Sequence, residues 1–288
     1  MQLIRVCYSL FMSEEISGFL RYPGGKRRML LFLKNHLPMP EELEGRYVEP
    51  FVGGGAVFFH MQPAQALLSD ANSDLIDIYR GIRYAPRKVW ISYRDFGNTK
   101  HDYQQIRDHA ECETLIKRAA RMLYLNRTCF KGMWRHNRQG DFNVGYGGQA
   151  RRWVISEDIL LHVNRLLKPA TIQCSDFEDI IDSTMEGDFL FLDPPYRPNE
   201  REAKNSHYVW QKFSFSDHQR LALALKKAKR RGVRWAMTTS SHSDIVQLFR
   251  GNRVLSIPRG TGRLPGILDT SKGEVLISSY KTEGSERI

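Results

Sequence analysis

The segment Tyr47-Val48-Glu49-Pro50-Phe51-Val52-Gly53-Gly54-Gly55-Ala56-Val57-Phe58-Phe59 joins a short apolar run, a loop of glycines and a second apolar run. This order predicts a strand, a tight loop and a helix in series, because glycine lets the backbone turn sharply and approach a ligand closely. A second unit follows, with a strand expected over residues 66–70 and a helix over residues 73–79. Strands that alternate with helices predict an α/β fold, with a parallel sheet covered on both faces.

The same alternation returns in the second half of the chain. Strands are expected over residues 171–174, 189–192, 233–237 and 274–280, and a helix over residues 217–231 that is capped by Ser216. A further helix is expected over residues 26–36. Between the two halves, residues 81–157 are basic and aromatic-rich, with one amphipathic helix over 114–126 and a hairpin over 130–148. We therefore expect a sheet domain built from residues 18–80 and 158–282, an insert at 81–157 and an N-terminal extension at 1–17.

The composition of the 288-residue chain favours a globular protein with a polyanionic partner. Hydrophobic residues make up 41% of it, the formal net charge is +11, and no apolar run approaches the length of a membrane span. The four cysteines lack metal-ligand or redox spacing, and the nine histidines form no zinc-like cluster. We expect no metal, and free thiols in a reducing cytoplasm.

Basic and aromatic side chains are interleaved in the insert. Lysines and arginines can neutralise phosphates, while aromatic rings can stack against bases. A solvated helix face and a set of core aromatics are the plainer interpretation for some of them. This set comprises Lys117, Arg118, Arg121, Arg127, Lys131, Arg135, Arg138, Arg151 and Arg152, with Phe130, Trp134, Phe142 and Tyr146 between them.

The apolar run Phe189-Leu190-Phe191-Leu192 leads into Asp193-Pro194-Pro195-Tyr196. A buried strand that ends here presents a carboxylate, a proline-stiffened turn with carbonyl acceptors, and an aromatic ring. Together these groups suit the exocyclic amino group of a planar base. An ordinary strand-ending turn is the competing interpretation, since Asp-Pro pairs are common in turns.

Asp70 ends the strand that follows the glycine loop, a position suited to accept hydrogen bonds from ribose hydroxyls. The loop lacks the full dinucleotide fingerprint and the P-loop lysine, so a phosphate site is not indicated. A tight turn and a helix cap are the plain interpretations of the glycines and of Asp70. A nucleoside ligand accounts for both features together.

Taken in order, these motifs resemble the Dam-like family of DNA adenine-N6 methyltransferases, and the resemblance covers residues 18–280. Its motifs are Tyr22-Pro23-Gly24-Gly25-Lys26, Glu49 to Gly55, Asp70-Ala71-Asn72-Ser73-Asp74-Leu75-Ile76, Asp193 to Tyr196 and, in the insert, Leu123 to Arg127, Gly132 to Arg135 and Gly140 to Val144. The resemblance implies a Rossmann-like, doubly wound methyltransferase sheet with an inserted helical and β-hairpin subdomain for DNA target recognition. It also implies S-adenosylmethionine as the methyl donor.

Position by position, the resemblance implies three sets of site residues. The catalytic set is Asp193, Pro194 and Tyr196. The donor-binding set is Tyr22, Lys26, Glu49, Phe51, Gly53, Gly55, Asp70, Ala71, Asp176 and Phe177. The DNA-binding set is Arg127, Phe130, Lys131, Met133, Arg135 and Asn137. Within it, Phe130 occupies the intercalating position and Arg135 the position that reads a guanine.

The resemblance further implies methylation of an adenine flipped out of duplex DNA by a monomeric, nucleoid-associated enzyme with no membrane partner. GATC is the expected target, although Lys131, Met133 and Gly145 replace the asparagine, leucine and proline of GATC-specific members. Three alternatives stay open: an RNA adenine methyltransferase, a cytosine-N4 methyltransferase, which more often carries serine at position 193, and a non-catalytic DNA-binding subunit of a defence system. The sequence also leaves open whether the enzyme partners a restriction enzyme, belongs to a phage or marks the chromosome.

Overall fold

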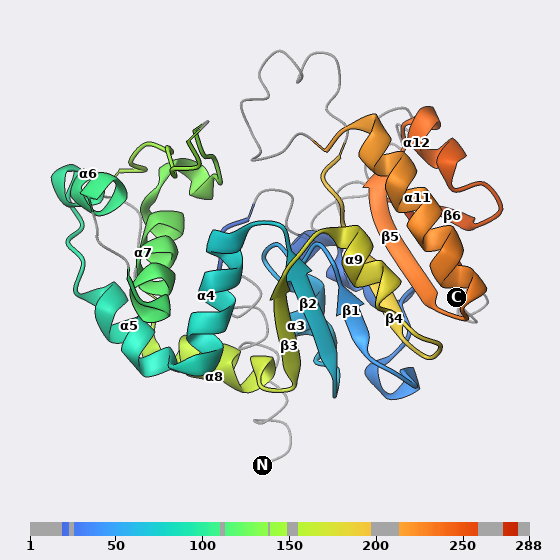
Figure 1. Cartoon of the computed structure of the whole chain (residues 1–288), viewed down its shortest axis with the longest axis horizontal. Helices are drawn as coiled ribbons and strands as arrows, with labels where there is room; N and C mark the ends of the chain where they lie inside the picture. Colours follow the sequence, from blue (N-terminus) through green and yellow to red (C-terminus); the bar gives the residue numbers. More distant parts are fainter. Residues whose placement is uncertain are drawn as a thin grey trace.

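The computed structural model describes residues 19–22, 26–109, 113–137, 139–148, 155–196, 213–258 and 273–281. Within them a seven-stranded sheet has the order β3-β2-β1-β4-β5-β7-β6 (Figure 1). The chain winds outward from β1 in both directions, so the predicted doubly wound α/β fold is confirmed. The strands are β1 (Tyr47–Glu49), β2 (Ala66–Asp70), β3 (Ala170–Cys174), β4 (Phe189–Leu192), β5 (Arg234–Ser240), β6 (Arg253–Ile257) and β7 (Glu274–Ser278).

Strand β7 departs from the expected parallel sheet. Strands β1 to β5 pair in parallel, whereas β7 runs antiparallel to both of its neighbours, β5 and β6. Strands β6 and β7 are consecutive in the chain and adjacent in the sheet, and antiparallel pairing is the usual result for such neighbours. Strand β6 itself was not predicted, because its exposed and half-buried residues alternate without a strong apolar run.

Helices cover both faces of the sheet, as predicted. Alternate residues of β4 enter different cores: Phe189 and Phe191 pack on one face, and Leu190 and Leu192 on the other. The first core includes side chains of α2 (Leu30–Lys34), α3 (Ala56–Met61) and α4 (Ser73–Tyr84). The second includes those of α9 (Phe177–Asp182), α11 (Phe215–Arg230) and α12 (Ser243–Leu248). None of the helices in the described ranges is long and apolar enough to cross a membrane.

The start of α11 corrects one expected detail. Ser214, not Ser216, caps this helix: its hydroxyl accepts a hydrogen bond from the Asp217 N–H, and the Asp217 carboxylate accepts one from the Ser214 N–H. Ser216 lies inside the first turn. A reciprocal capping box satisfies two helix-terminal donors, which favours Ser214 over a serine two residues later.

The insert contains more helix than the sequence predicted. The expected amphipathic helix is α7 (Leu115–Thr128), capped by Thr114. Two further helices of the insert pack against it, α5 (Pro86–Arg94) and α6 (Lys100–His109), and α8 (Glu157–Leu167), which follows the insert, packs against α4 and α5. Together with α4 they form a helical lobe beside the sheet (Figure 1). Helix α4 runs across the expected boundary at residue 81, and the boundaries of the domains stay predictions.

The hairpin that was expected over residues 130–148 follows α7. Its two arms are joined by backbone hydrogen bonds from Phe130 to Gly145 and from Asn143 to Arg135. The imidazole of His136 lies 2.8 Å from the Asp74 carboxylate, which ties the hairpin to the start of α4. The expected N-terminal extension at 1–17 lies outside the described residues, as do residues 23–25 and Arg138.

Candidate active site at the carboxyl edge of the sheet

The acidic turn after β4 lies at the carboxyl edge of the parallel strands. Asp193 Oδ1 accepts a hydrogen bond from Thr238 Oγ1 at 2.8 Å, and Lys26 Nζ lies 2.8 Å from the same oxygen. Pro194, the next residue in the chain, is buried. The side chain of Lys26 is 5% exposed and that of Asp193 is 23% exposed. A lysine so deeply buried needs a partner for its charge, and Asp193 provides one.

Tyr196 and Glu274 complete this corner. The Lys26 ammonium lies 4.8 Å from the centre of the Tyr196 ring, which is close enough for a cation–π interaction. Burial, with Asp193 and Glu274 nearby, raises the pKa of the Tyr196 phenol, so it stays protonated at neutral pH. Burial also raises the pKa of Glu274, and the Asp193 charge adds to this, while Lys26 opposes it. Within the described part of the chain, Glu274 Oε2 is buried without a hydrogen bond.

The glycine loop after β1 needs its glycines. Gly53 and Gly55 have φ values of +46° and +67°, which L side chains rarely adopt. A Cβ on Gly53 would stand 3.0 Å from the Tyr22 ring, and one on Gly55 would stand 2.8 Å from the Tyr79 hydroxyl. The Tyr79 hydroxyl also donates a hydrogen bond to the Gly53 carbonyl at 2.8 Å. The loop is therefore fixed in shape beneath the Tyr22 ring.

Asp70, at the end of β2, is held by backbone donors. The Gly53 N–H and the Asn72 N–H donate to its two carboxylate oxygens at 3.1 and 3.0 Å. Burial raises the pKa of Asp70 to about 6, although these hydrogen bonds favour the charged form. Ala71 follows at the turn into α4, and Cys174, at the end of β3, lies opposite Asp70 in the sheet. The strand ends thus bring the glycine loop and Asp70 together as expected.

Glu49, at the end of β1, lies between the two parts of the site. The Tyr47 hydroxyl donates a hydrogen bond to it at 2.8 Å. Burial raises the pKa of Glu49 well above its usual range, and the charges of Asp193 and Asp70 raise it further. The same two aspartates, after burial itself, raise the pKa of Tyr22. Strands β2, β1 and β4 therefore carry Asp70, Glu49 and Asp193 to one electrostatically coupled edge.

Phe51, Asp176 and Phe177 were expected to bind the donor. Phe177 is buried in the second core and Phe51 packs against it, whereas Asp176 is exposed beside them. The Phe51 and Phe177 rings stack with centres 5.4 Å apart. The Asp176 carboxylate caps α9 by accepting from the Glu178 N–H, and it pairs with Arg220 at 2.9 Å. The hydrogen bonds of Asp176 therefore stabilise the fold. Asp176 follows β3 and so lies at the carboxyl edge of the parallel strands.

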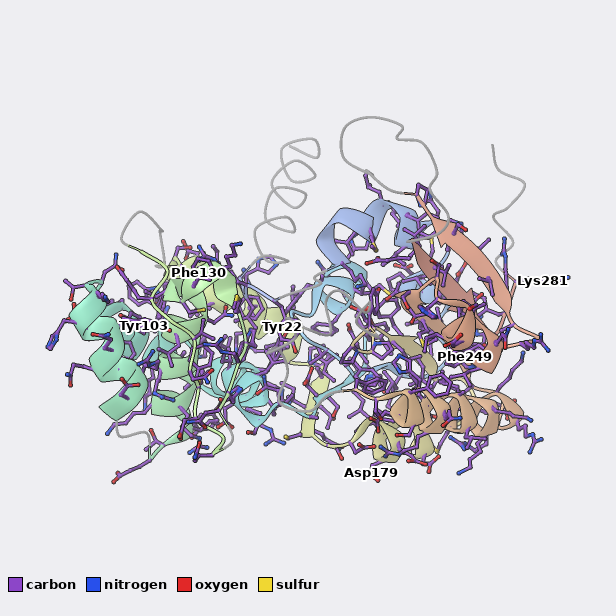
Figure 2. All side chains as sticks on the ribbon, turned by 90° about the horizontal axis from the view of Figure 1, so that it is seen from above. Tyr22, Tyr103, Phe130, Asp179, Phe249 and Lys281 are labelled. Carbon is purple, nitrogen blue, oxygen red and sulfur yellow. The ribbon has the colours of Figure 1, made fainter. Side chains whose placement is uncertain are left out.

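Some of the residues that were expected to contact DNA are exposed to solvent, and others are half-buried against the protein. Phe130 is 46% exposed on the hairpin (Figure 2), and the exposed Lys131, with φ of +56°, holds its ammonium 5.2 Å from the Phe130 ring centre. Arg127 is half-buried instead. Its guanidinium lies 3.5 Å from the Phe19 carbonyl, and burial lowers the pKa of Arg127.

The other three expected contacts serve the hairpin itself. Arg135 donates from Nε and Nη2 to the side chain and the carbonyl of Asn143, both at 2.8 Å. Asn137 organises the tip, because its side-chain oxygen accepts from the backbone N–H groups of Gln139 and Asp141. Met133 is half-buried against the first core. Of the expected set, only Phe130 and Lys131 are exposed, and the other four are half-buried.

A short N-terminal segment, Phe19–Tyr22, connects the hairpin with the glycine loop. The Asn126 side chain accepts from the Arg21 N–H at 2.9 Å and donates to the Arg21 carbonyl at 2.6 Å. The Trp134 indole donates to the same carbonyl at 3.1 Å. The next residue, Tyr22, lies between the hairpin that carries Phe130 and the sheet (Figure 2). Asn126 and Trp134 therefore set the position of Tyr22.

Sequence reasoning missed Thr238 and Glu274. Glu274 begins one expected strand and Thr238 lies one residue beyond another, but no sequence signal links either of them to Asp193. Their proximity comes from strand pairing, since β5 lies beside β4 and β7 beside β5. Among the residues placed by the structure, no cluster of His, Cys, Asp and Glu has the arrangement of a metal site.

Comparison with known proteins gives consistent matches. The model of the D12 class N6 adenine-specific DNA methyltransferase family matches residues 22–260. The type II methyltransferase M.MjaIII of Methanocaldococcus jannaschii is 31% identical over 297 residues, which covers 92% of this chain and 100% of the relative. A DNA adenine methylase of Vibrio cholerae is 30% identical over 262 residues, covering 85% and 92%. A solved rRNA methyltransferase, aviRa of Streptomyces viridochromogenes, is 11% identical with a TM-score of 0.33 over 87% and 82% of the two chains, too weak a likeness for any inference.

Proposed function

Because this chain belongs to the D12 class N6 adenine-specific DNA methyltransferase family, we propose that it transfers a methyl group from S-adenosylmethionine to N6 of an adenine everted from duplex DNA. One observation carries the proposal. The acidic turn at Asp193 and the glycine loop with Asp70 lie at the same edge of the sheet, on either side of Glu49 at the end of β1. A base amine held by the turn therefore faces a nucleoside held by the loop.

The residues at this edge fit S-adenosylmethionine. The Asp70 carboxylate, fixed by two backbone N–H groups, is placed to accept from ribose hydroxyls, and the loop around Gly53 lets the backbone approach a ligand. The carboxylates of Asp70 and Asp193 outnumber the ammonium of Lys26 at this edge, which favours a ligand that bears positive charge. When bound, S-adenosylmethionine supplies an electrophilic methyl group on a sulfonium.

The chemistry proposed for the acidic turn concerns the amino group of adenine. The N6 lone pair is delocalised into the purine ring, which makes this nitrogen a poor nucleophile. The Asp193 carboxylate and the Pro194 carbonyl each accept one N6–H, which favours a tetrahedral nitrogen and stabilises the positive charge that develops on it. Tyr196 supplies an aromatic face for the base beside the acid.

The proposed substrate is duplex DNA, with GATC as the first target to test. An adenine inside a duplex is inaccessible, so the base must leave the stack at a cost of a few kcal/mol. Phe130, exposed on the hairpin, is suited to fill the gap, and Lys131 to contact a phosphate. The family and the net charge of +11 support a DNA partner. We place the enzyme, as a monomer, in the cytoplasm with the DNA that it modifies.

The substitution Asp193→Ala tests this function. We expect methylation of duplex DNA to slow by about 10²–10³-fold or more, because the acceptor for the reacting amine is lost, while the affinity for S-adenosylmethionine stays largely intact. Methylation is measured by mass spectrometry of N6-methyladenine on duplex DNA and on RNA of the same sequence. Calorimetry measures donor binding.

The control is Asp179→Ala, which removes an exposed carboxylate on α9 (Figure 2). It should leave both the rate and donor binding unchanged. Full activity of the Asp193→Ala enzyme would defeat the assignment of the acid. A wild-type enzyme that methylates the RNA in preference to the duplex would overturn the choice of substrate.

A further inference from the structure

The two carboxylate oxygens of Asp193 are in different surroundings. Oδ1 is 2.8 Å from both the Thr238 hydroxyl and the Lys26 ammonium. In the part of the chain that the structure describes, no donor makes a hydrogen bond to Oδ2, although the buried Tyr196 hydroxyl lies close to both Asp193 and Thr238. One oxygen is thus engaged by two donors while the other is left as an acceptor.

Thr238 is well placed to fix this asymmetry. It lies on β5, one residue beyond the pairing of Met237 with Leu192 of β4, and it is fully buried. A β-branched side chain in a strand has restricted χ1, so its hydroxyl has a defined direction. The hydroxyl carries one hydrogen, and the Leu192 carbonyl at 3.5 Å is the weaker acceptor than the carboxylate at 2.8 Å.

We propose that Thr238 is a positioning residue for Asp193: its hydroxyl, together with Lys26, holds Oδ1 and thereby directs Oδ2 toward the amino group of the substrate base. This inference rests on the proposed function of the site. It adds to that function a residue on a neighbouring strand that touches neither the base nor the donor.

The physical need for such a residue follows from the aspartate side chain. Rotation about the bond that carries the carboxylate is broad, so the side chain by itself does not fix the plane of the two oxygens. Lys26 alone does not fix this angle, because an ammonium is a point charge without a preferred direction toward the carboxylate plane. A rigid hydroxyl at a fixed point in the sheet does fix it. Small errors in the position of a reacting group are costly to the rate.

The neighbouring residue offers a matched control. Thr239 is on the same strand and equally buried, but its side chain points to the opposite face of the sheet, and its hydroxyl has no hydrogen-bond partner in the described residues. Thr238→Val and Thr239→Val therefore make the same chemical change at adjacent, equally buried positions. Only the first removes a donor from Asp193.

We expect Thr238→Val to lower the single-turnover methylation rate by about 10- to 100-fold, the usual effect of losing one hydrogen bond to a charged group. The affinities for S-adenosylmethionine and for duplex DNA should stay within about threefold of wild type. Thr239→Val should retain the wild-type rate, because the hydroxyl that it removes makes no hydrogen bond. Thr238→Ser, which keeps the donor, should recover most of the rate. Melting temperatures of all three variants monitor folding.

Several results would overturn the inference. These are a wild-type rate in Thr238→Val, equal losses in the two valine variants, or a Thr238→Ser enzyme as slow as Thr238→Val. If Thr238→Val does not fold, the comparison of Thr238→Ser with Thr238→Ala decides in the same way.

A structural readout separates this inference from the proposed function. A crystal structure of Thr238→Val without DNA should show the Asp193 carboxylate rotated or in two orientations, and an unchanged carboxylate would contradict the role of Thr238. This measurement needs no activity. The wild-type rate and the Asp193→Ala variant test the proposed function, whereas the ratio of Thr238→Val to wild type tests Thr238.

Discussion

The Asp70 carboxylate is buried and held by backbone N–H groups, and keeping it ionised without a ligand is unfavourable for the free protein. Burial raises its pKa to about 6, which means that the protein around it disfavours the charge. The Gly53 and Asn72 N–H groups recover part of that penalty by donating to the charged form. An acid in this state is ionised at pH 7.5 and largely protonated at pH 5.

This predicts a pH dependence of donor binding. The ionised carboxylate is the better acceptor for two ribose hydroxyls, so protonation on going from pH 7.5 to pH 5 should weaken the affinity for S-adenosylmethionine by up to about tenfold. The loss should begin near pH 6, where Asp70 gains its proton. Calorimetry at half-unit pH steps measures it.

Asp70→Asn is the control for this titration, because its amide does not titrate. The variant should bind the donor weakly and with little change between pH 7.5 and pH 5. If the variant keeps the wild-type slope, another group is responsible. A flat wild-type profile would show that Asp70 does not govern the affinity.

At the scale of elements, the hairpin after α7 contains some residues that stabilise it from within and others that are exposed to solvent. Arg135 and Asn137 hold the two arms together, while Phe130 and Lys131 face solvent at the hairpin's start. The left-handed backbone at Lys131 and Gly132 produces a sharp bend there, and Gly132 packs closely on Arg21. A large exposed ring on a braced hairpin suits contact with a partner rather than packing of the core.

Phe130→Ala should therefore affect DNA and not the fold. We expect kcat/KM on duplex DNA to fall by about 10- to 100-fold, because the ring no longer offsets the unstacking of the base. Donor affinity should stay the same, and the free energy of unfolding should change by less than about 1 kcal/mol. Methylation kinetics, calorimetry and chemical denaturation measure these quantities.

Leu31→Ala provides a matched loss of exposed apolar surface elsewhere, since Leu31 on α2 is 73% exposed. It should leave all three measurements near wild type. A mismatched or nicked duplex, in which eversion costs less, should also reduce the defect of Phe130→Ala. An equal defect on every substrate would argue against a role in base eversion.

At the scale of the whole molecule, the segment Phe19–Tyr22 joins the insert to the sheet. Asn126 is fully buried on α7 and bonds both to the N–H and to the carbonyl of Arg21. Loss of its side chain removes both of these hydrogen bonds, and the Arg21 carbonyl keeps the one from the Trp134 indole. The segment also leads to Lys26, whose ammonium reaches Asp193 across the sheet edge.

Asn126→Ala should lower both stability and donor affinity. We expect a loss of about 1–3 kcal/mol in the free energy of unfolding, because two partly buried hydrogen bonds to the Arg21 backbone are lost. Donor binding should weaken by about tenfold, since Tyr22 is no longer held over the glycine loop. Chemical denaturation and calorimetry measure the two effects.

Asn164→Ala separates stability from the site. Asn164 on α8 donates to the carbonyls of Ile82 and Arg83 at 2.9 and 2.8 Å, which joins two helices away from the sheet edge. Its loss should lower stability while leaving donor affinity intact. If both variants weaken donor binding equally, the effect of Asn126→Ala reflects general destabilisation and not the position of Tyr22.

Much of the sheet and of the site could be predicted from local pattern. The strand, glycine loop and helix over residues 47–59 were correct, as were α7 and the hairpin, because each is marked by its own residues. The short helices α5 and α6 were missed. They are mostly polar, and what stabilises them is the burial of Val89, Tyr93 and Tyr103 in the shared core, which no local window reports.

The sequence by itself determined the order of strands and helices, the glycine loop, the acidic turn and the family, since these depend on residues adjacent in the chain. Tertiary structure alone decided that Lys26 and Thr238 share one oxygen of Asp193, that Arg127 is half-buried and that β7 is reversed. The physical reason is distance along the chain. Pairing of strands and burial of charge bring together groups that no local pattern connects.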